Sequence, residues 1–214
     1  MNVTFEDCYK FNHSSNILVS GQSGSGKSYF AKKLLKQANH TFSPVPKHFY
    51  WFYAIKQQDI ESELPFVTFI DGTEGDVFEK IQTLHDAVVV LDDLTEYIPI
   101  KHLNILFTVL GHHQKLSLMY LCQNLFYKNH RLLSINSHYN VFISTLRDYS
   151  SVKALAIQLF ASKFKYLLDA INDCQNSDTF FYLILNSKAG FLDNKRRLYR
   201  GIFSDERLTA YEIK

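Results

Sequence analysis

The sequence has few cysteines and no long apolar run. Its 214 residues include only Cys8, Cys122 and Cys174, which are odd in number, far apart and without metal-ligand spacing. This pattern argues against a disulfide framework and a zinc site, and it predicts reduced thiols in an intracellular compartment. No uninterrupted apolar stretch reaches the roughly 18 residues that a membrane-spanning helix requires. Because Glu6 and Asp7 stand where a signal peptide would be apolar, we expect a soluble protein that contacts no membrane.

The sequence also lacks a strong excess of charge. Lys and Arg total 23 against 21 Asp and Glu, a formal charge of +2. No broad field for polyanions is therefore predicted, and any contact with nucleic acid must be local. The only dense basic cluster lies beyond Gly190 and comprises Lys195, Arg196, Arg197 and Arg200. Such a cluster suits contact with DNA phosphates, although it is usually a solvated face.

Apolar runs bounded by turn residues alternate with helical patterns along the chain. This order is typical of an α/β fold with a mostly parallel sheet covered by helices on both faces. We expect strands at 16–20, 49–55, 66–70, 87–91, 116–122, 139–145 and 180–185, the last closing the fold. Helices are expected after residue 28 and at 76–85, 101–111 and 149–162, while 124–137 reads as irregular and 163–178 is ambiguous. The length suits one domain over residues 1–214, with a basic tail from about 191.

A complete phosphate-loop motif follows the first expected strand. The G-x-x-x-x-G-K-[ST] pattern is met by Gly21, Gln22, Ser23, Gly24, Ser25, Gly26, Lys27 and Ser28, and Tyr29 continues into the helix. Glycines allow successive N–H groups to point at one phosphate, and the helix N-terminus adds its dipole. Lys27 is expected to span the β- and γ-phosphates of ATP, and the Ser28 hydroxyl to ligate Mg²⁺. The alternative is a glycine-rich surface turn, but both the preceding strand and the following helix are predicted.

Polar residues follow two of the expected buried strands. Asp92 ends the run 88–92 and is the candidate that holds Mg²⁺, and Asp93 is the candidate that polarises the attacking water. Gln123 follows the strand 116–122 and is the candidate sensor of the γ-phosphate. Asp is also common in ordinary turns, and Gln123 alone would read as a strand-end amide. The chain order predicts that the sensor strand lies between the phosphate-loop strand and the acidic strand, as in a RecA-like (ASCE) P-loop NTPase.

Several further segments resemble motifs of the FtsK/HerA-type genome-packaging ATPases of double-stranded DNA viruses. They are Phe-Thr at 107–108, Gly-His-His at 111–113, Ser117, Gln-Asn-Leu-Phe at 123–126, Ile-Asn-Ser-His-Tyr at 135–139 and Leu-Arg-Asp at 146–148. The likeness covers nearly the whole chain and is greatest to the ATPases of Polinton (Maverick) elements, adintoviruses and virophages. Paired aspartates, as at Asp92 and Asp93, are frequent in members related to Polintons. The closing stretch 197–203 is similar to a basic-apolar ending in these proteins.

The resemblance implies a motor that assembles as a homo-oligomeric ring, a hexamer or pentamer, around double-stranded DNA. Such a ring drives DNA into a preformed capsid at a portal or vertex, in the nucleus or at a cytoplasmic assembly site, and can be virion-associated. An arginine from the neighbouring subunit completes each ATP site, and Arg131 and Arg147 are the candidates, either of which could equally be a surface arginine. His112 and His113 match family positions, but their spacing supports no metal site.

Two other functions remain open at this point. A small-molecule phosphotransferase also uses a phosphate loop, although no arginine-rich lid is evident in the sequence. A nucleotide-binding capsid-assembly protein without significant hydrolysis is the other, because the short side chain of Asp93 is less suited than Glu to act as a base. The sequence also departs from many relatives by Gln22 in place of proline, which should leave phosphate binding unaffected because backbone groups supply the donors.

Overall fold

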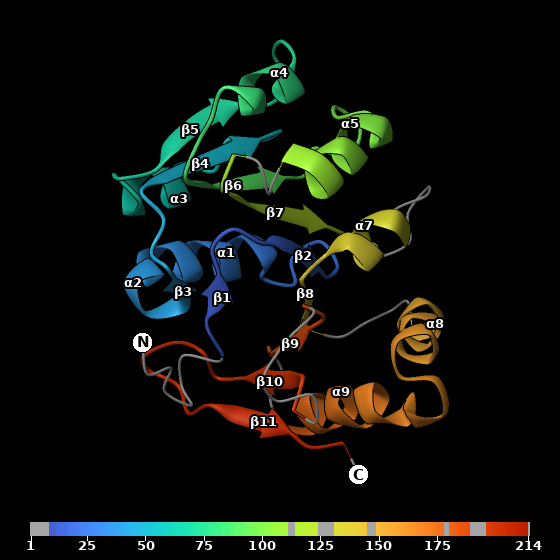
Figure 1. Cartoon of the computed structure of the whole chain (residues 1–214). Coiled ribbons are helices and arrows are strands. Elements are labelled where there is room, and N and C mark those ends of the chain that lie inside the picture. Colours follow the sequence, from blue (N-terminus) through green and yellow to red (C-terminus); the bar gives the residue numbers. More distant parts are fainter. Residues whose placement is uncertain are drawn as a thin grey trace.

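A nine-stranded sheet forms the centre of the molecule, with strand order β11-β10-β9-β8-β2-β7-β6-β4-β5 (Figure 1). The computed structural model describes residues 9–110, 114–123, 131–144, 149–177, 180–188 and 196–213. Six adjacent strands run parallel: β5 (Thr68–Asp71), β4 (His48–Tyr53), β6 (Ala87–Asp92), β7 (Leu116–Cys122), β2 (Asn16–Ser20) and β8 (Tyr139–Ile143). These strands confirm the predicted α/β fold with a mostly parallel sheet.

The expected sensor strand β7 lies between the phosphate-loop strand β2 and the acidic strand β6. Ser20 pairs with Cys122, and Leu121 pairs with Asp92, so the three strands end at one edge of the sheet. All residues of β2, β6 and β7 are buried. Side chains on both faces of each strand must therefore pack against other elements, which explains the nearly continuous apolar runs in the sequence.

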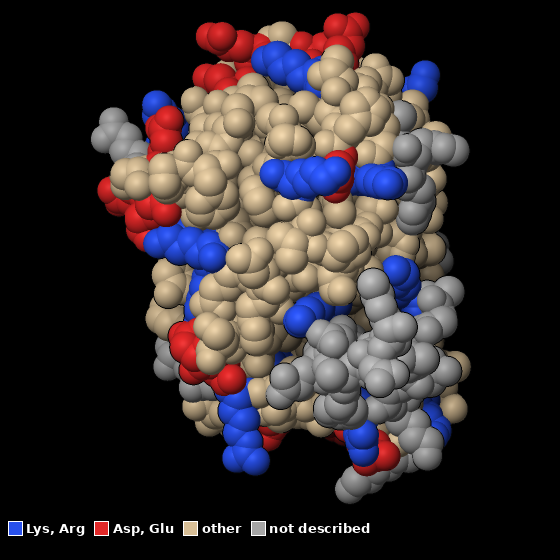
Figure 2. Space-filling model, turned by 60° about the vertical axis from the view of Figure 1, so that its left-hand side comes forward, with Lys and Arg blue, Asp and Glu red and all other residues tan. Residues whose placement is uncertain are grey.

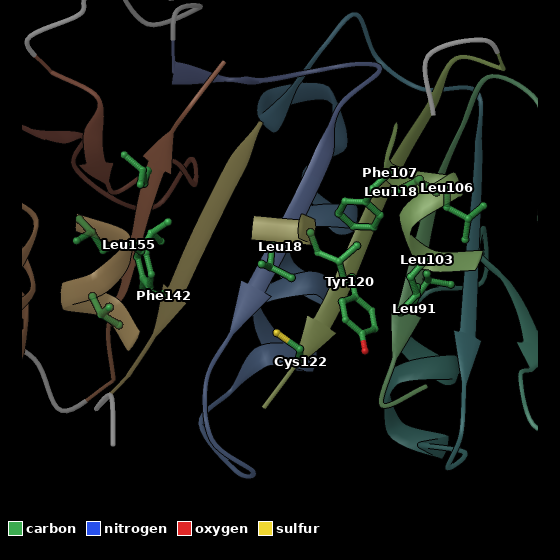
Figure 3. Close-up of a cluster of buried hydrophobic side chains, with 14 of the residues drawn as sticks. Leu18, Leu91, Leu103, Leu106, Phe107, Leu118, Tyr120, Cys122, Phe142 and Leu155 are labelled. Carbon is green, nitrogen blue, oxygen red and sulfur yellow. The ribbon is translucent and has the colours of Figure 1, made fainter. Parts of the chain in front are cut away.

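Helices cover both faces of the sheet and bury two separate hydrophobic clusters. The first cluster joins one side of the sheet to α4 (Val77–Gln82), α5 (Ile100–Ile105), α7 (Arg131–Asn136), α8 (Tyr149–Phe160) and α9 (Lys165–Ser177). Figure 3 shows part of this cluster, to which the strands contribute Leu18, Leu91 and Tyr120 and α5 contributes Leu103. The second cluster joins the other side to α1 (Lys27–Lys36), α2 (Ala38–Thr41) and α3 (Gln58–Glu63). Adjacent β2 residues alternate between the clusters, as expected for a strand buried on both faces.

The C-terminal part of the chain corrects the expectation that the strand at 180–185 closes the fold. β9 (Tyr182–Asn186) pairs antiparallel with β8, and β10 (Leu198–Arg200) and β11 (Thr209–Tyr211) extend the sheet beyond it. Strands β10 and β11 have three residues each, which is too few to display an alternating pattern. Two pieces of the expected basic tail, 198–200 and 209–211, are therefore built into the sheet.

Other boundaries also differ from the sequence-based expectations. The segment 124–137, expected to be irregular, contains α7, and the ambiguous segment 163–178 forms a 3-10 turn (Ala161–Lys163) and then α9. The expected helix 101–111 is α5 followed by a π-helix at Leu106–Leu110. Two short strands, β1 (Phe11–Asn12) and β3 (Phe42–Ser43), pair in parallel outside the main sheet. Within the described part of the chain, no helix has the length and apolar character needed to cross a bilayer.

Candidate nucleotide-binding site

The phosphate loop connects the end of β2 to the start of α1 and is held at the edge of the sheet. Gly24 and Gly26 have φ angles of 74° and 98°, which only glycine adopts readily. The Gly21 N–H donates to the Cys122 carbonyl at 3.2 Å, so the loop is joined to the end of the sensor strand. A side chain at Gly21 would lie 2.8 Å from the Ile143 carbonyl of β8. The predicted loop thus has the backbone conformation that directs N–H groups toward an anion.

The Lys27 side chain lies inside the phosphate loop. It is 6% exposed, and its ammonium donates to the carbonyls of Gly21 and Gln22, both at 2.9 Å. Burial lowers the pKa of Lys27, and the negative charge of Asp93 and, to a smaller extent, Asp92 opposes this effect. A cation in this position can interact with a phosphate bound in the loop.

Ser28 and Asp92 meet across the gap between α1 and β6. The Ser28 hydroxyl donates to Asp92 Oδ2 at 3.1 Å, and Asp92 is 3% exposed. Burial raises the pKa of Asp92 to about 6, and repulsion from Asp93 adds to this, while hydrogen bonds from Ser28 and Trp51 oppose it. A hydroxyl and a carboxylate are the hard oxygen ligands that Mg²⁺ prefers. The donor set therefore fits the predicted ion, and Ser28 and Asp92 are the residues that would hold it.

The remaining Mg²⁺ ligands would have to come from nucleotide phosphates and water. Among the described residues, no group of three or more His, Cys, Asp or Glu side chains could hold a metal by itself. Magnesium sites commonly use one or two protein ligands together with substrate phosphates. The site is thus suited to a nucleotide-bound ion.

Asp93 and Gln123 lie at the same edge of the sheet as the loop. Asp93 directly follows β6, is exposed and has a φ of 54°, so the chain turns sharply there. Its charge acts on both Lys27 and Asp92. Gln123 directly follows β7, whose last residue, Cys122, bonds to the loop. The structure therefore brings the five residues with predicted phosphate, metal and water roles to one edge: Lys27, Ser28, Asp92, Asp93 and Gln123.

The two candidate arginines are not placed in this site. Arg131 begins α7, but its side chain lies outside the described part of the chain, as do Arg147, His112 and His113. The role of an arginine from a neighbouring subunit stays a prediction. In the expected basic cluster, Arg197 Nε donates to the Asn186 carbonyl at 2.8 Å, and Arg196 lies 3.6 Å from Glu212.

One face of the molecule carries charges of both signs. Figure 2 shows Lys and Arg interspersed with Asp and Glu across a mostly uncharged face, and its described residues form no continuous basic stripe. Any DNA contact by this face would have to be local.

Two residues near Asp92 were missed by sequence reasoning. Gln57 Nε2 lies 3.4 Å from Asp92 Oδ2, and the Trp51 side chain also donates to that carboxylate. Gln57 lies shortly after β4, which neighbours β6 in parallel. A search for polar side chains after every parallel strand could have found Gln57. Trp51 gave no such signal, because an aromatic residue within a strand normally reads as core.

A second feature beside the phosphate loop was also missed. A cavity of about 810 Å³ touches the loop at Ser25 and Gly26 and extends between α1 and the segment 200–209. No sequence pattern indicated it, because its walls come from segments far apart in the chain. Its lining includes several aromatic residues, with Tyr29, Phe180 and Phe203 among them.

A Ser-His-Asp arrangement at the opposite edge of the sheet has a structural role. His13 Nδ1 lies 2.8 Å from Ser117 Oγ, and His13 Nε2 lies 3.0 Å from Asp86 Oδ1. Ser117 is 0% exposed, so no substrate can reach its hydroxyl. The three side chains instead fasten the segment before β2 to the starts of β6 and β7.

Comparison with known proteins adds whole-chain structural relatives. No family model matches the sequence, and no curated protein sequence matches it. The structure is similar to B204, the DNA-packaging ATPase from Sulfolobus turreted icosahedral virus, with a TM-score of 0.55 and 13% identity, covering 95% of this chain and 100% of that one. B204 from Sulfolobus turreted icosahedral virus 2 in complex with AMP gives a TM-score of 0.54 at 14% identity, covering 80% and 92%.

A cellular P-loop protein is similar over the same extent. The KaiC-like protein of Pyrococcus horikoshii OT3 gives a TM-score of 0.50 at 10% identity, covering 94% of this chain and 91% of that chain. The chain has the P-loop NTPase fold. At these identities the likeness concerns the fold, and the chemistry must be argued from the residues of the site.

Proposed function

We propose that this chain is a Mg²⁺-dependent ATPase that acts in a ring to move double-stranded DNA into a viral capsid. The observation that carries the ATPase proposal is the joint position of Lys27 inside the phosphate loop and Ser28 at 3.1 Å from the Asp92 carboxylate. The packaging proposal is supported by the motif resemblance to FtsK/HerA-type ATPases and by the whole-chain similarity to B204, a viral DNA-packaging ATPase.

The proposed reaction follows from the positions of these side chains. Lys27 neutralises charge on the β- and γ-phosphates, and the loop N–H groups hold the β-phosphate. Asp93 accepts a hydrogen bond from the attacking water, and Gln123 orients that water and senses the γ-phosphate. Water then attacks the γ-phosphorus, the bond to the β-phosphate oxygen breaks, and ADP, phosphate and a proton are released. Bound Mg²⁺ supplies charge neutralisation on the phosphate oxygens.

ATP turnover of the purified chain, with and without duplex DNA, tests the proposal. Wild-type protein should hydrolyse ATP faster when DNA is added, and Lys27→Ala should abolish turnover. Mass measurement of the same samples establishes whether a ring has assembled. If an assembled ring hydrolyses ATP at the same rate with and without DNA, the result would contradict DNA translocation. Turnover that requires a small phosphoryl acceptor would favour a phosphotransferase, and ATP binding without turnover would favour an assembly protein.

Mixing two inactive variants tests whether neighbouring subunits share each ATP site. In Lys27→Ala the subunit's own phosphate loop is defective, whereas Arg147→Ala or Arg131→Ala should deprive the neighbour's site of its arginine. If an arginine acts between subunits, a mixed ring contains some interfaces with both an intact loop and an intact arginine. ATPase activity should then reappear on mixing, and only for the arginine that acts in this way. Mixed rings as inactive as the separate variants would reject both candidates.

A further inference from the structure

The cavity beside the phosphate loop lies on the opposite side from the magnesium ligands. Ser28 and Asp92 are on the side of the loop that faces β7 and β6. The cavity touches the loop at Ser25 and Gly26 and is walled by the end of β8, the start of β9 and the end of β10. In the sheet, β8, β9 and β10 follow β2 in the direction away from β6. A nucleotide with its γ-phosphate near Asp92 would therefore have its other end directed toward the cavity.

The cavity has the lining of a site for a flat aromatic ligand. Tyr29 of α1 and Phe180, which lies shortly before β9, both line it and are 61% and 74% exposed. Large exposed rings that line the same hollow are costly in water unless a ligand covers them. Its volume of about 810 Å³ is within the range of small-molecule sites, roughly 300–1,000 Å³. Arg200 and Arg207 also line it and place positive charge near an anionic ligand.

The outer wall is already fastened to the phosphate-loop helix. Lys33 of α1 donates to Asp205 and Glu206, both at 2.9 Å. The Phe203 ring packs against Phe30 of α1 and Tyr182 of β9, with centroid separations of 5.6 and 5.4 Å. These contacts hold the segment 201–209 in place without a ligand, so binding need not order it.

We propose that this cavity binds the purine nucleoside of the nucleotide, with the base against the rings of Tyr29 and Phe180. The inference rests on the proposed function, because it requires the phosphates in the phosphate loop. The segment 201–209 then belongs to the nucleotide site, a role different from the DNA contact suggested for the basic tail of which it is a part.

Calorimetric titration of the full-length chain with ADP and, separately, with inorganic triphosphate tests the assignment. Loss of one base–aromatic contact should weaken ADP binding at least about fivefold in Phe180→Ala and in Tyr29→Ala. Triphosphate binding should stay within about twofold of wild type in both variants, because it has no base to stack. Phe66→Ala is the matched control: Phe66 is 50% exposed and packs near Phe49 at the distant edge of the sheet.

The outcomes separate this inference from the proposed function. Lys27→Ala should weaken the binding of both ADP and triphosphate. If wild-type protein binds neither ligand, the ATPase proposal and the nucleoside site are both rejected. ADP binding that depends on Lys27 but is unchanged by both aromatic substitutions would reject the nucleoside site alone. If the aromatic substitutions weaken ADP binding and triphosphate binding equally, the nucleoside site is also rejected. The rings would then affect binding by changing the conformation of the phosphate loop.

Discussion

Replacing Asp92 with asparagine is expected to stabilise the nucleotide-free protein above about pH 6 while removing ATP turnover. Asp92 is buried, and the charge of Asp93 lies next to it, so its ionised form is unfavourable in the folded chain. Asparagine has nearly the same shape without the charge. The same substitution removes the carboxylate proposed to hold Mg²⁺, so stability and activity should change in opposite directions.

The size of the effect follows from the pKa of Asp92. A pKa of about 6 in the folded protein, against an ordinary value of 3.8, means that folding disfavours the ionised form by about 3 kcal/mol. Asparagine can still accept the hydrogen bond from Ser28. Its NH₂ group, however, can face Gln57 Nε2, which lies 3.4 Å from Oδ2, and two donors then oppose each other at some cost in stability. We therefore expect a net gain of about 1–3 kcal/mol near pH 8.

The gain should develop as the pH rises from 3.8 to about 6, because Asp92 ionises in the unfolded chain before it ionises in the folded chain. Between pH 3.8 and about 6 the folded chain retains a proton that the unfolded chain has released. Wild-type stability attributable to Asp92 therefore falls as the pH rises through this window and is constant above it. Below the window the carboxyl group is neutral in both states, so the variant should show no gain there.

Urea unfolding in the presence of EDTA, repeated at several pH values, measures this difference. Asp169→Asn is the control, because Asp169 is an exposed aspartate in α9. Its stability difference from wild type should be small, because an exposed side chain makes few contacts. An Asp92→Asn protein less stable than wild type near pH 8 would refute the argument that burial of this charge destabilises the empty site. A stability gain of Asp92→Asn that is equally large below pH 3.8 would also refute it.

Three further predictions concern the backbone and the buried thiol. Gly21→Ala should destabilise the protein by about 1–3 kcal/mol, because the new Cβ would lie 2.8 Å from the Ile143 carbonyl; thermal unfolding measures this. Gly201→Ala should cost about 3 kcal/mol or more, since φ is 76° and the Cβ would overlap the Arg207 carbonyl; an unchanged melting temperature would contradict it. Burial raises the pKa of Cys122 to about 12, so iodoacetamide should label its peptide only after unfolding, as mass spectrometry can detect.

The parallel part of the fold could be predicted because its strands are buried on both faces. Strands such as Ala87–Asp92 and Leu116–Cys122 appear as apolar runs that end in polar residues. The glycine motif located the phosphate loop, and the chain order correctly indicated which strand lies in the middle. The phosphate and magnesium side of the candidate site was therefore accessible from the sequence.

The nucleoside side was not accessible, for physical reasons. Strands β10 and β11 are three residues long, so neither displays a period, and the basic residues at 195–200 suggested a solvated tail. The cavity also combines residues from α1, β8, β9 and the segment 200–209. Contacts between segments this distant in sequence depend on the packing of the whole sheet. Local patterns do not encode them, and the two exposed rings of Tyr29 and Phe180 gained meaning only once they were seen to share one hollow.

The unfavourable charge at Asp92 also increases the expected affinity of the protein for a Mg²⁺-nucleotide complex. A buried carboxylate beside Asp93 raises the free energy of the folded chain, and a cation bound between the loop and β6 removes that penalty. The free energy released on relief of the repulsion adds to the affinity for the Mg²⁺-nucleotide complex, because binding and folding are linked. Mg²⁺-ADP should consequently raise the melting temperature of wild-type protein more than that of Asp92→Asn. An equal rise in both proteins would mean that the carboxylate does not face the bound cation.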